Sequence, residues 1–263
     1  EPNLIPRLMF EDGVYEPAEA IVIDKSLELI AKNAGKVTIK NDNLITLLIF
    51  SGDGELILSG IHFENGYTET FTNAIEIQSG HLEMSACKSS LTLMGGASAR
   101  VINSEFSNST IGFHLKDNAK GEIINCVFKE NLQGLAIQDE ASVVSKSNIY
   151  KQNQDSGIGV HHSASLQSMK DIAYNNLVGF GLVNDASVTI EEAKSYENQI
   201  YGFYANFKSK VALKSCKTYL NATSGIAVFG DSQFDIQECD FFDNDSCGLE
   251  MGDTSKCRLV NSK

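Results

Sequence analysis

Seven glycines recur at a nearly constant interval in the second half of this 263-residue chain. The steps between them are 22, 23, 22, 23, 23 and 23 residues. The series consists of Gly112, Gly134, Gly157, Gly179, Gly202, Gly225 and Gly248. A fixed period this short means that each repeat is one supersecondary unit stacked on its neighbours. The spacing therefore predicts a solenoid.

Within each repeat, apolar residues alternate with polar ones over short stretches. After Gly225, for example, Ile226 and Val228 alternate, and so do Phe234 and Ile236. This period of two is typical of strands and not of helices. Three short strands and three turns in 22 or 23 residues predict one coil of an all-β parallel β-helix. The leucine–asparagine signature of leucine-rich repeats is missing, and ankyrin or tetratricopeptide arrays need longer, helical repeats.

An asparagine precedes each glycine by three or four positions. The series is Asn108, Asn131, Asn153, Asn176, Asn198, Asn221 and Asn244. Asparagine tolerates left-handed backbone angles at tight turns, and its amide can bond nearby backbone groups. Equivalent amides in stacked coils lie about 4.8 Å apart, close enough to hydrogen-bond from coil to coil. We predict that these seven residues form an asparagine ladder.

Two further columns follow the same period. Cys126, Cys216 and Cys239 each lie 14 residues after a glycine, so we expect them to point inward together. An aromatic stripe lies just before the asparagines and consists of Phe106, Phe128, Tyr150, Tyr174, Tyr196, Tyr219 and Phe242. We favour an internal aromatic stack for this stripe over a platform on which sugars would stack.

The whole chain, 1–263, is predicted to form one β-helix domain of about ten coils. The first coils, 1–60, are irregular, a polar loop is inserted at 66–73, and regular coils occupy 108–263. The chain starts without methionine and ends partway through a coil, and an open solenoid end normally needs a cap. We therefore expect a fragment of a longer protein, or a processed one.

Composition limits the partners. The net charge is −13 and no basic stripe exists in the sequence, so we expect neither nucleic acid, nor anionic lipid, nor another polyanion to bind through salt contacts. No apolar run is long enough to span a membrane. The six cysteines show no metal-binding or CxxC spacing, and glycans on the three Asn-x-Ser/Thr triplets would prevent stacking. These features favour the cytosol, with the periplasm or secretion as alternatives.

The repeat, with its Gly-Ile-x-Val opening and its closing asparagine, resembles the right-handed parallel β-helix of the pectin-lyase-like superfamily. The segments Asp12–Glu16 and Ile21–Ile30 are similar to the first coil of carbohydrate-binding and sugar-hydrolase type repeats. Such repeats occur in β-helical F-box proteins, Shc SH2-domain-binding proteins and periplasmic copper-associated β-helix proteins. The resemblance implies the fold and leaves the activity open.

Enzymes of this superfamily carry recognisable motifs that the chain lacks. The Asn-Thr-Asp, Asp-Asp, His-Gly and Arg-Ile-Lys set of polygalacturonases is absent, as is the Asp-Pro-His of mannuronan epimerases. Arg100 is the only arginine in the middle of the chain, and the surroundings typical of a pectate lyase base are missing. We therefore predict no catalytic residue and no cofactor.

Two surfaces are candidates for binding. The turn tips after each glycine form one edge, where Phe207 and Phe229 are expected to be exposed. On the same edge, His162 with Asp185 could hold a metal or move protons. No third orienting group is apparent, however, and no metal site is predicted.

The second candidate is a flat strand face. The second residue after each glycine is expected to point outward, which gives the row His114, Ala136, Gly159, Gly181, Tyr204, Ala227 and Glu250. The small middle of this row, between His114 and Tyr204, could receive an extended peptide or glycan. Crowding between coils would favour small residues equally well, and both interpretations remain open here.

Three functions follow from these surfaces. We favour a non-catalytic recognition or scaffolding rod that binds a protein segment or a glycan along the flat face or the turn-tip edge. The first alternative is a polysaccharide lyase or glycoside hydrolase with a non-standard acidic site near His161, His162 and Asp185. The second alternative is a structural spacer. The oligomeric state is not predicted.

Overall fold

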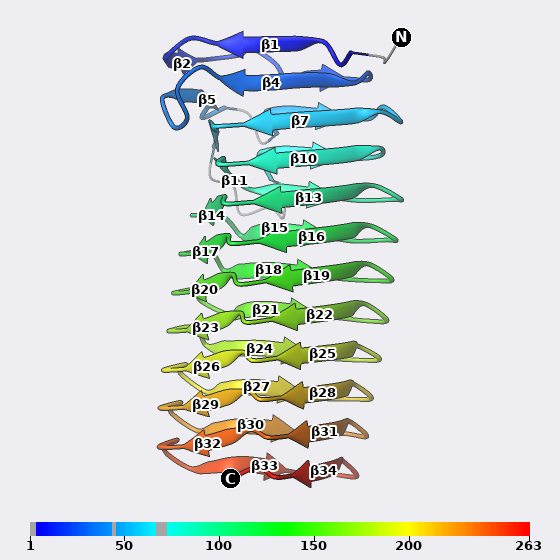
Figure 1. Ribbon diagram of the computed structural model, residues 1–263, viewed down its shortest axis with the longest axis vertical. Coiled ribbons are helices and arrows are strands. Elements are labelled where there is room, and N and C mark those ends of the chain that lie inside the picture. Colours follow the sequence, from blue (N-terminus) through cyan, green and yellow to red (C-terminus); the bar gives the residue numbers. More distant parts are fainter. Residues whose placement is uncertain (1–3, 44–45, 67–72) are drawn as a thin grey trace.

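The computed structural model describes residues 4–43, 46–66 and 73–263. In this part of the chain the backbone winds as a stack of coils, each with up to three short strands (Figure 1). The strands form three parallel sheets, which we call A, B and C in the order in which the chain visits them. The loop predicted at 66–73 lies almost entirely outside the described residues.

Sheet A has twelve strands, and sheets B and C have eleven each. Sheet A contains β1 (Arg7–Phe10), β4 (Leu27–Ala31), β7 (Glu55–Ser59), β10 (His81–Ser85), β13 (Ser98–Ile102), β16 (Lys120–Ile124), β19 (Ser142–Lys146), β22 (Ser165–Met169), β25 (Ser187–Glu191), β28 (Lys210–Lys214), β31 (Gln233–Gln237) and β34 (Lys256–Val260). Sheet B contains β2 (Gly13–Tyr15), β5 (Val37–Asn41), β8 (Ile61–Asn65), β11 (Lys88–Ser89), β14 (Glu105–Ser107), β17 (Val127–Lys129), β20 (Ile149–Lys151), β23 (Ile172–Tyr174), β26 (Lys194–Tyr196), β29 (Lys217–Tyr219) and β32 (Asp240–Phe242). Sheet C contains β3 (Ile21–Ile23), β6 (Leu48–Phe50), β9 (Ile75–Ile77), β12 (Leu91–Leu93), β15 (Ile111–Leu115), β18 (Gln133–Ile137), β21 (Ser156–Val160), β24 (Val178–Leu182), β27 (Tyr201–Ala205), β30 (Ser224–Val228) and β33 (Cys247–Met251).

Each strand pairs with the strands three places before and after it, always in parallel. The predicted all-β parallel β-helix is thus confirmed, with one coil more than the expected ten or so. At a strand spacing of about 4.8 Å, the stack is about 50 Å long. The first coils differ in length, since Arg7 pairs with Glu28 and Glu28 with Ile57, whereas the coils after Ser98 repeat every 22 or 23 residues.

The asparagine ladder joins six consecutive coils at the turn between sheets B and C. The Oδ1 of Asn153, for example, accepts two hydrogen bonds from Asn131, one from its backbone N–H at 3.2 Å and one from its side-chain Nδ2 at 3.1 Å. It also donates from its own Nδ2 to the carbonyl of Phe128. The same pattern continues to Asn176, Asn198, Asn221 and Asn244.

The prediction that Asn108 belongs to this ladder is wrong. Asn108 is exposed and has a φ of 57°, and Ser109 occupies the ladder position, donating its N–H to the Oδ1 of Asn131. In each coil from Ser109 onward, the residue before the ladder position is left-handed, as Glu130 and Gln152 show. Asn108 satisfies the backbone requirement of that preceding residue and therefore mimics a ladder asparagine in the sequence.

The aromatic stripe divides between the two sides of sheet B. The rings of Phe106, Phe128 and Tyr150 are fully buried and stack at centroid distances of 4.9 and 4.6 Å. The other four rings stack at 4.9–5.1 Å on the outer side, in the row that begins with Lys129 and Lys151; these are Tyr174, Tyr196, Tyr219 and Phe242. The prediction of one internal stack is wrong for these four, because a shift of one residue reverses the side of the sheet.

A second internal column lies at the turn between sheets A and B. It consists of Cys87, Ser104, Cys126, Asn148, Asp171, Ala193, Cys216, Cys239 and Ser262, each of which follows a left-handed residue. The predicted inward placement of Cys126, Cys216 and Cys239 is confirmed, and all six cysteines are free thiols. Asn148 accepts the N–H of Cys126, and Asp171 accepts the N–H of Asn148, both at 2.7 Å.

Asp171 is a buried carboxyl group inside this column. Its Oδ2 accepts the hydroxyl of Ser168 at 2.7 Å, and no cation pairs with it among the described residues. Burial raises the pKa of Asp171 to about 6, against its ordinary 3.8, because desolvation penalises the ionised form. In the folded chain this carboxyl is therefore mostly protonated below about pH 6.

Replacing Asn176 by alanine tests the ladder. The change leaves the N–H of Asn153 and the carbonyl of Tyr150 unsatisfied in a buried turn. Each such group costs about 1–3 kcal/mol, so we expect Asn176→Ala to lower the free energy of unfolding by about 3 kcal/mol. Urea denaturation measures this, with exposed Asn118→Ala as control. Equal losses in both variants would contradict the ladder's role.

Replacing Asp171 by asparagine tests the buried carboxyl. A folded-state pKa above the unfolded value gives stability that is fully present below pH 3.8 and is lost as the pH rises through about 6. The asparagine can bond as Asn148 does one coil earlier, through its amide to Ile123 and Ser145. We expect Asp171→Asn to raise the free energy of unfolding by about 2–3 kcal/mol at pH 7.5 and to change it little near pH 4. Urea denaturation across this pH range would contradict the assignment if both proteins showed the same pH profile.

Candidate functional site

The outer face of sheet A carries two rows of mostly polar residues, which are small in the middle of the sheet. Strand alternation points Ala99, Gly121, Val143 and Leu166 inward, while their neighbours point to solvent. The parallel register then aligns the outward residues coil by coil. One row runs Ser98, Lys120, Ser142, Ser165, Ser187, Lys210, Gln233, Lys256, and the other runs Arg100, Glu122, Val144, Gln167, Thr189, Ala212, Asp235, Arg258.

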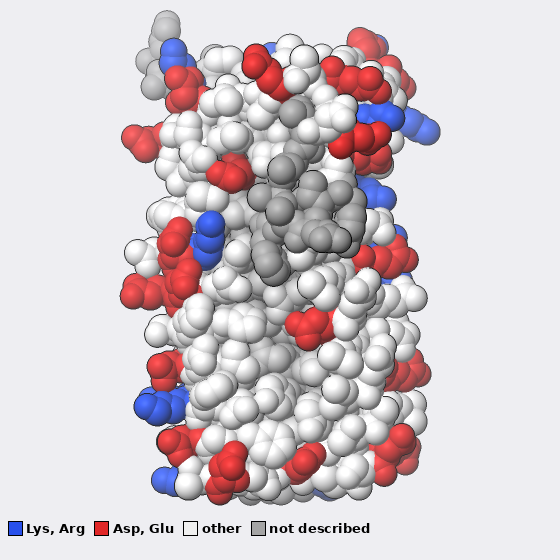
Figure 2. Space-filling view, turned by 180° about the vertical axis from the view of Figure 1, so that it is seen from behind, with Lys and Arg blue, Asp and Glu red and all other residues white. Residues whose placement is uncertain are grey.

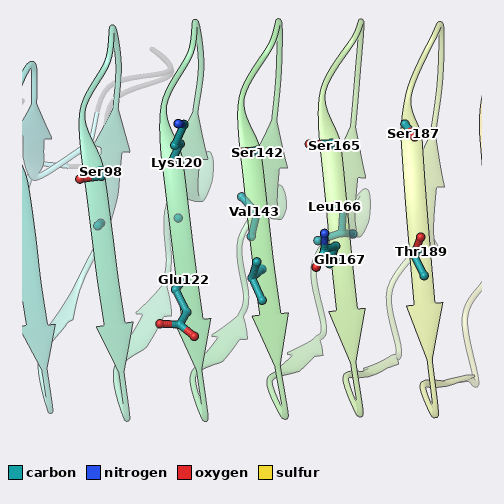
Figure 3. A pocket seen from close by; sticks show the side chains of 13 residues that line it. Ser98, Lys120, Glu122, Ser142, Val143, Ser165, Leu166, Gln167, Ser187 and Thr189 are labelled. Carbon is teal, nitrogen blue, oxygen red and sulfur yellow. The ribbon is translucent and has the colours of Figure 1, made fainter.

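Small side chains in the middle of these rows leave a shallow trough. Its first part, of about 450 Å³, extends from Ser98 to Thr189 (Figure 3). Its second part, of about 500 Å³, extends from Ser187 to Arg258. Because both parts are lined by Ser187 and Thr189, they form one surface, which we call the sheet A trough. Its polar lining consists of hydroxyl groups, the amides of Gln167 and Gln233 and several long charged side chains, and apolar side chains of the same strands line the rest.

A line of ion pairs crosses the first end of the trough. Arg100 contacts Glu83 at 3.7 Å and Glu122 at 3.3 Å, and Lys146 contacts the other oxygen of Glu122 at 2.9 Å. The hydrogen bond from Lys146, together with the charges of Lys146 and Arg100, lowers the pKa of Glu122. This carboxylate therefore stays ionised near neutral pH and is poorly suited to donate a proton.

The remaining charges of the trough are mostly cationic. Arg258 pairs with Asp235 at 3.1 Å, but no carboxylate of the described residues pairs with Lys120, Lys210 or Lys256. The lining thus contains four cations and two carboxylates, although the chain as a whole carries −13. The sheet A trough is thus a locally basic surface on an acidic protein, and the expectation of no basic stripe is wrong for this face, because residues far apart in the sequence line up only when the coils stack.

Figure 2 shows the opposite side, where charged side chains are sparse over the lower half and gather at the margins. On this face of sheet C the predicted row from His114 to Glu250 is aligned as expected. His114 is 8% exposed, contacts Gln138 at 3.1 Å, and has a pKa lowered by burial. Tyr204 stacks on Tyr201 at 5.5 Å.

The small residues of that row do not form an open strip. The side chain of Gln133 lies over Gly159, donates to Ser156 at 2.7 Å, and approaches the ring of His161. Burial lowers the pKa of His161. Ala136 and Ala227 have no exposed surface. At Gly159 a long neighbour from the same sheet therefore fills the space that the glycine leaves, whereas Gly181 stays partly exposed.

The other residues predicted to bind a ligand lie at the turn tips, where the structure does not gather them into one site. His162 pairs with Asp139, one coil earlier, at 3.0 Å, and not with Asp185. Phe207 is 58% exposed and has a φ of 67°. Phe229 is half-buried against Tyr204, at a centroid distance of 6.1 Å. Asp185 and Phe207 do share one hollow of about 460 Å³ at the tips.

Sequence reasoning missed the sheet A trough, although a signal for it exists. The dipeptide Ala-Ser recurs at Ser98, Ser142, Ser165 and Ser187, in phase with the glycines. The alanine is buried and the serine points outward at the first position of its strand. The repeated serines indicate a surface that is kept small through several successive coils.

Comparison with known proteins gives a family and a fold. The family model described as "Right handed beta helix region" matches residues 21–192 and 171–263. No curated protein sequence matches the chain. No helix in the described residues is long and apolar enough to cross a membrane.

Several solved structures share the coil architecture. The periplasmic alginate epimerase AlgG is 13% identical with a TM-score of 0.60, over 98% of this chain and 85% of that one. The Dettilon tailspike protein is 9% identical with a TM-score of 0.72, over 97% and 62%. The A-module of the Azotobacter vinelandii mannuronan C-5 epimerase AlgE4 is 13% identical with a TM-score of 0.51, over 98% and 90%. At such identities the likeness establishes the fold alone, including its right-handed winding.

Proposed function

Because the chain belongs to the right-handed β-helix family, we propose that it binds an acidic polysaccharide along the sheet A trough without cleaving it. The observation that carries this proposal is the excess of positive charge in the trough of a strongly acidic chain. Fold membership alone supports many functions, so the argument rests on the trough.

The lining chemistry suits a chain of sugars. The hydroxyls of Ser142, Ser165 and Thr189 and the amide of Gln167 can both donate and accept hydrogen bonds, as sugar hydroxyls do. Lys120, Lys210 and Lys256 have no carboxylate partner among the described residues and can bind carboxylates of the ligand. Repeating groups along the rod match a repeating polymer.

The trough is also preformed. Its residues lie on strands that are paired on both sides from β13 to β31, and on the end strand β34, which pairs with β31. Binding therefore costs little ordering of the protein. Positive charge would steer an anionic polymer to this face despite the repulsion from the rest of the molecule.

The carboxyl groups of the trough favour binding over catalysis. General acids of glycosidases have raised pKa values, whereas the pKa of Glu122 is lowered and Asp235 pairs with Arg258. The described carboxyl with a raised pKa, Asp171, lies inside the rod. The similar structures, by their titles, include alginate epimerases and a tailspike protein, which supports a glycan as ligand.

Alginate oligosaccharides, whose sugars each carry a carboxylate, test this function by titration calorimetry, with neutral dextran oligosaccharides as control. We expect saturable binding of alginate that weakens with added NaCl, because salt screens the contacts. The double variant Lys210→Ala/Lys256→Ala should lose about fivefold to tenfold in affinity, since each exposed contact contributes up to about 1 kcal/mol. Lys151→Ala, on sheet B, should bind like the unaltered chain.

Ser165→Tyr provides a second test, because it fills the middle of the trough and leaves the charges intact. We expect it to abolish alginate binding. Equal binding of dextran and alginate, or normal binding by Ser165→Tyr, would contradict the proposal. A change in the length or uronate composition of the recovered alginate would instead support an enzyme.

A further inference from the structure

A cluster of three possible metal ligands lies on the outer face of sheet A, next to the first strand of the trough. Glu55 of β7 is the direct cross-strand partner of His81 in β10, and Glu83 lies two residues beyond His81 on the same face. Their ligand atoms all lie within 4.8 Å of one another. From this arrangement we propose that Glu55, His81 and Glu83 bind a divalent transition-metal ion, with Zn²⁺ as the best match.

The geometry is close to that of a metal site. The Nε2 of His81 is 3.0 Å from the Oε1 of Glu83. Nitrogen and oxygen ligands bind zinc at about 2.1 Å, which places the corners of a tetrahedron roughly 3.4 Å apart. Small rotations of the two carboxylates therefore suffice to close the three atoms around an ion. Three protein ligands leave the fourth position open to water.

The two carboxylates of the cluster would also be stabilised by a bound cation. The carboxylate of Glu55 has neither a hydrogen-bond donor nor a cation as partner among the described side chains. Glu83 contacts Arg100 only through its other oxygen, Oε2, at 3.7 Å. The Oε1 of Glu83 is hydrogen-bonded to the Nε2 of His81, and an ion bound between these two atoms would replace that bond. The carboxylate of Glu55 faces the same imidazole from the neighbouring strand and completes the set of three ligands.

Ser98 gives His81 the support that metal-binding histidines usually have. Its hydroxyl lies 2.8 Å from the Nδ1 of His81. Metal-bound histidines generally donate their second ring N–H to a neighbour, which fixes the tautomer and the ring orientation. A serine hydroxyl can accept that bond when Nε2 holds an ion, and it can donate to Nδ1 when Nε2 carries the proton instead. Ser98 therefore fits both states.

The ligand types select the metal. Imidazole suits zinc, copper, iron and nickel, whereas calcium and magnesium take oxygen ligands, usually six or more. One imidazole and two carboxylates therefore favour Zn²⁺ over Ca²⁺.

Zinc titration of the chain tests the proposal. Since Cys247 and Cys257 are the cysteines that are not fully buried, the experiment uses the Cys247→Ser/Cys257→Ser background. Calorimetry gives the affinity and stoichiometry, and the ring resonances of His81 in NMR report on the site itself. We expect one ion per chain, a large shift of the His81 resonances, and binding at least tenfold weaker for Ca²⁺.

The variants separate this site from other histidines. His81→Ala and Glu55→Gln should each weaken zinc binding by roughly tenfold or more, and Ser98→Ala by about tenfold. All three changes lie on an outer sheet face, and circular dichroism will confirm that the variants fold. His162→Ala is the matched control, because His162 also lies 3.0 Å from a carboxylate but lacks a second one.

The proposal is overturned if zinc does not saturate one site, or if His81→Ala and Glu55→Gln bind as before. Loss of binding in His162→Ala alone would also overturn it, as would equal affinities for Ca²⁺ and Zn²⁺. None of these results depends on a glycan ligand, so the outcome is independent of the function proposed above.

Discussion

Hydrogen bonding from each coil to the next is the interaction on which the whole structure depends. No coil buries enough surface to be stable alone, and each obtains its backbone partners from the coils above and below. At the turns, where strand pairing stops, side chains take over this role. Asn153 satisfies the backbone of one coil and the amide of the next, and Asn148 with Asp171 does the same on the other corner. At these turns, side-chain hydrogen bonds thus join neighbouring coils where the strand pairing stops.

This stacking also determines the surfaces. Every residue has equivalents directly above and below it, so a residue type that recurs at one position of several coils forms a continuous row on the surface. Repeated serines on sheet A produce a trough that crosses several strands (Figure 3). The trough of small residues ends where longer side chains occupy the same position of the row. Arg100 and Glu122 close one end of the small-residue region, and Lys210 begins the other. The proposed metal cluster lies just beyond the first end.

A shift of one residue along a strand decides whether a side chain points into the core or to the solvent. Tyr150 is fully buried in the middle of its strand, whereas Tyr174 lies outside at the end of the next one. Both precede an asparagine in the sequence, so the aromatic stripe looks uniform there. The same ambiguity made Asn108 resemble a ladder residue, although Ser109 holds that position. Spacing locates the corner of a coil, but a shift of one position decides which side a residue occupies.

The sequence by itself determined the period, the strand alternation, the all-β solenoid and most of the asparagine ladder, because these properties repeat along the chain and are local to each coil. The tertiary structure decided which side chains meet across coils. It pairs His162 with Asp139 and not with Asp185, covers Gly159 with Gln133, and brings Glu55 beside His81. These contacts depend on coil lengths, which vary between Glu55 and Ser98, and on how long side chains fill neighbouring space. Neither quantity is a periodic property of the sequence, so only the folded chain reveals the candidate sites.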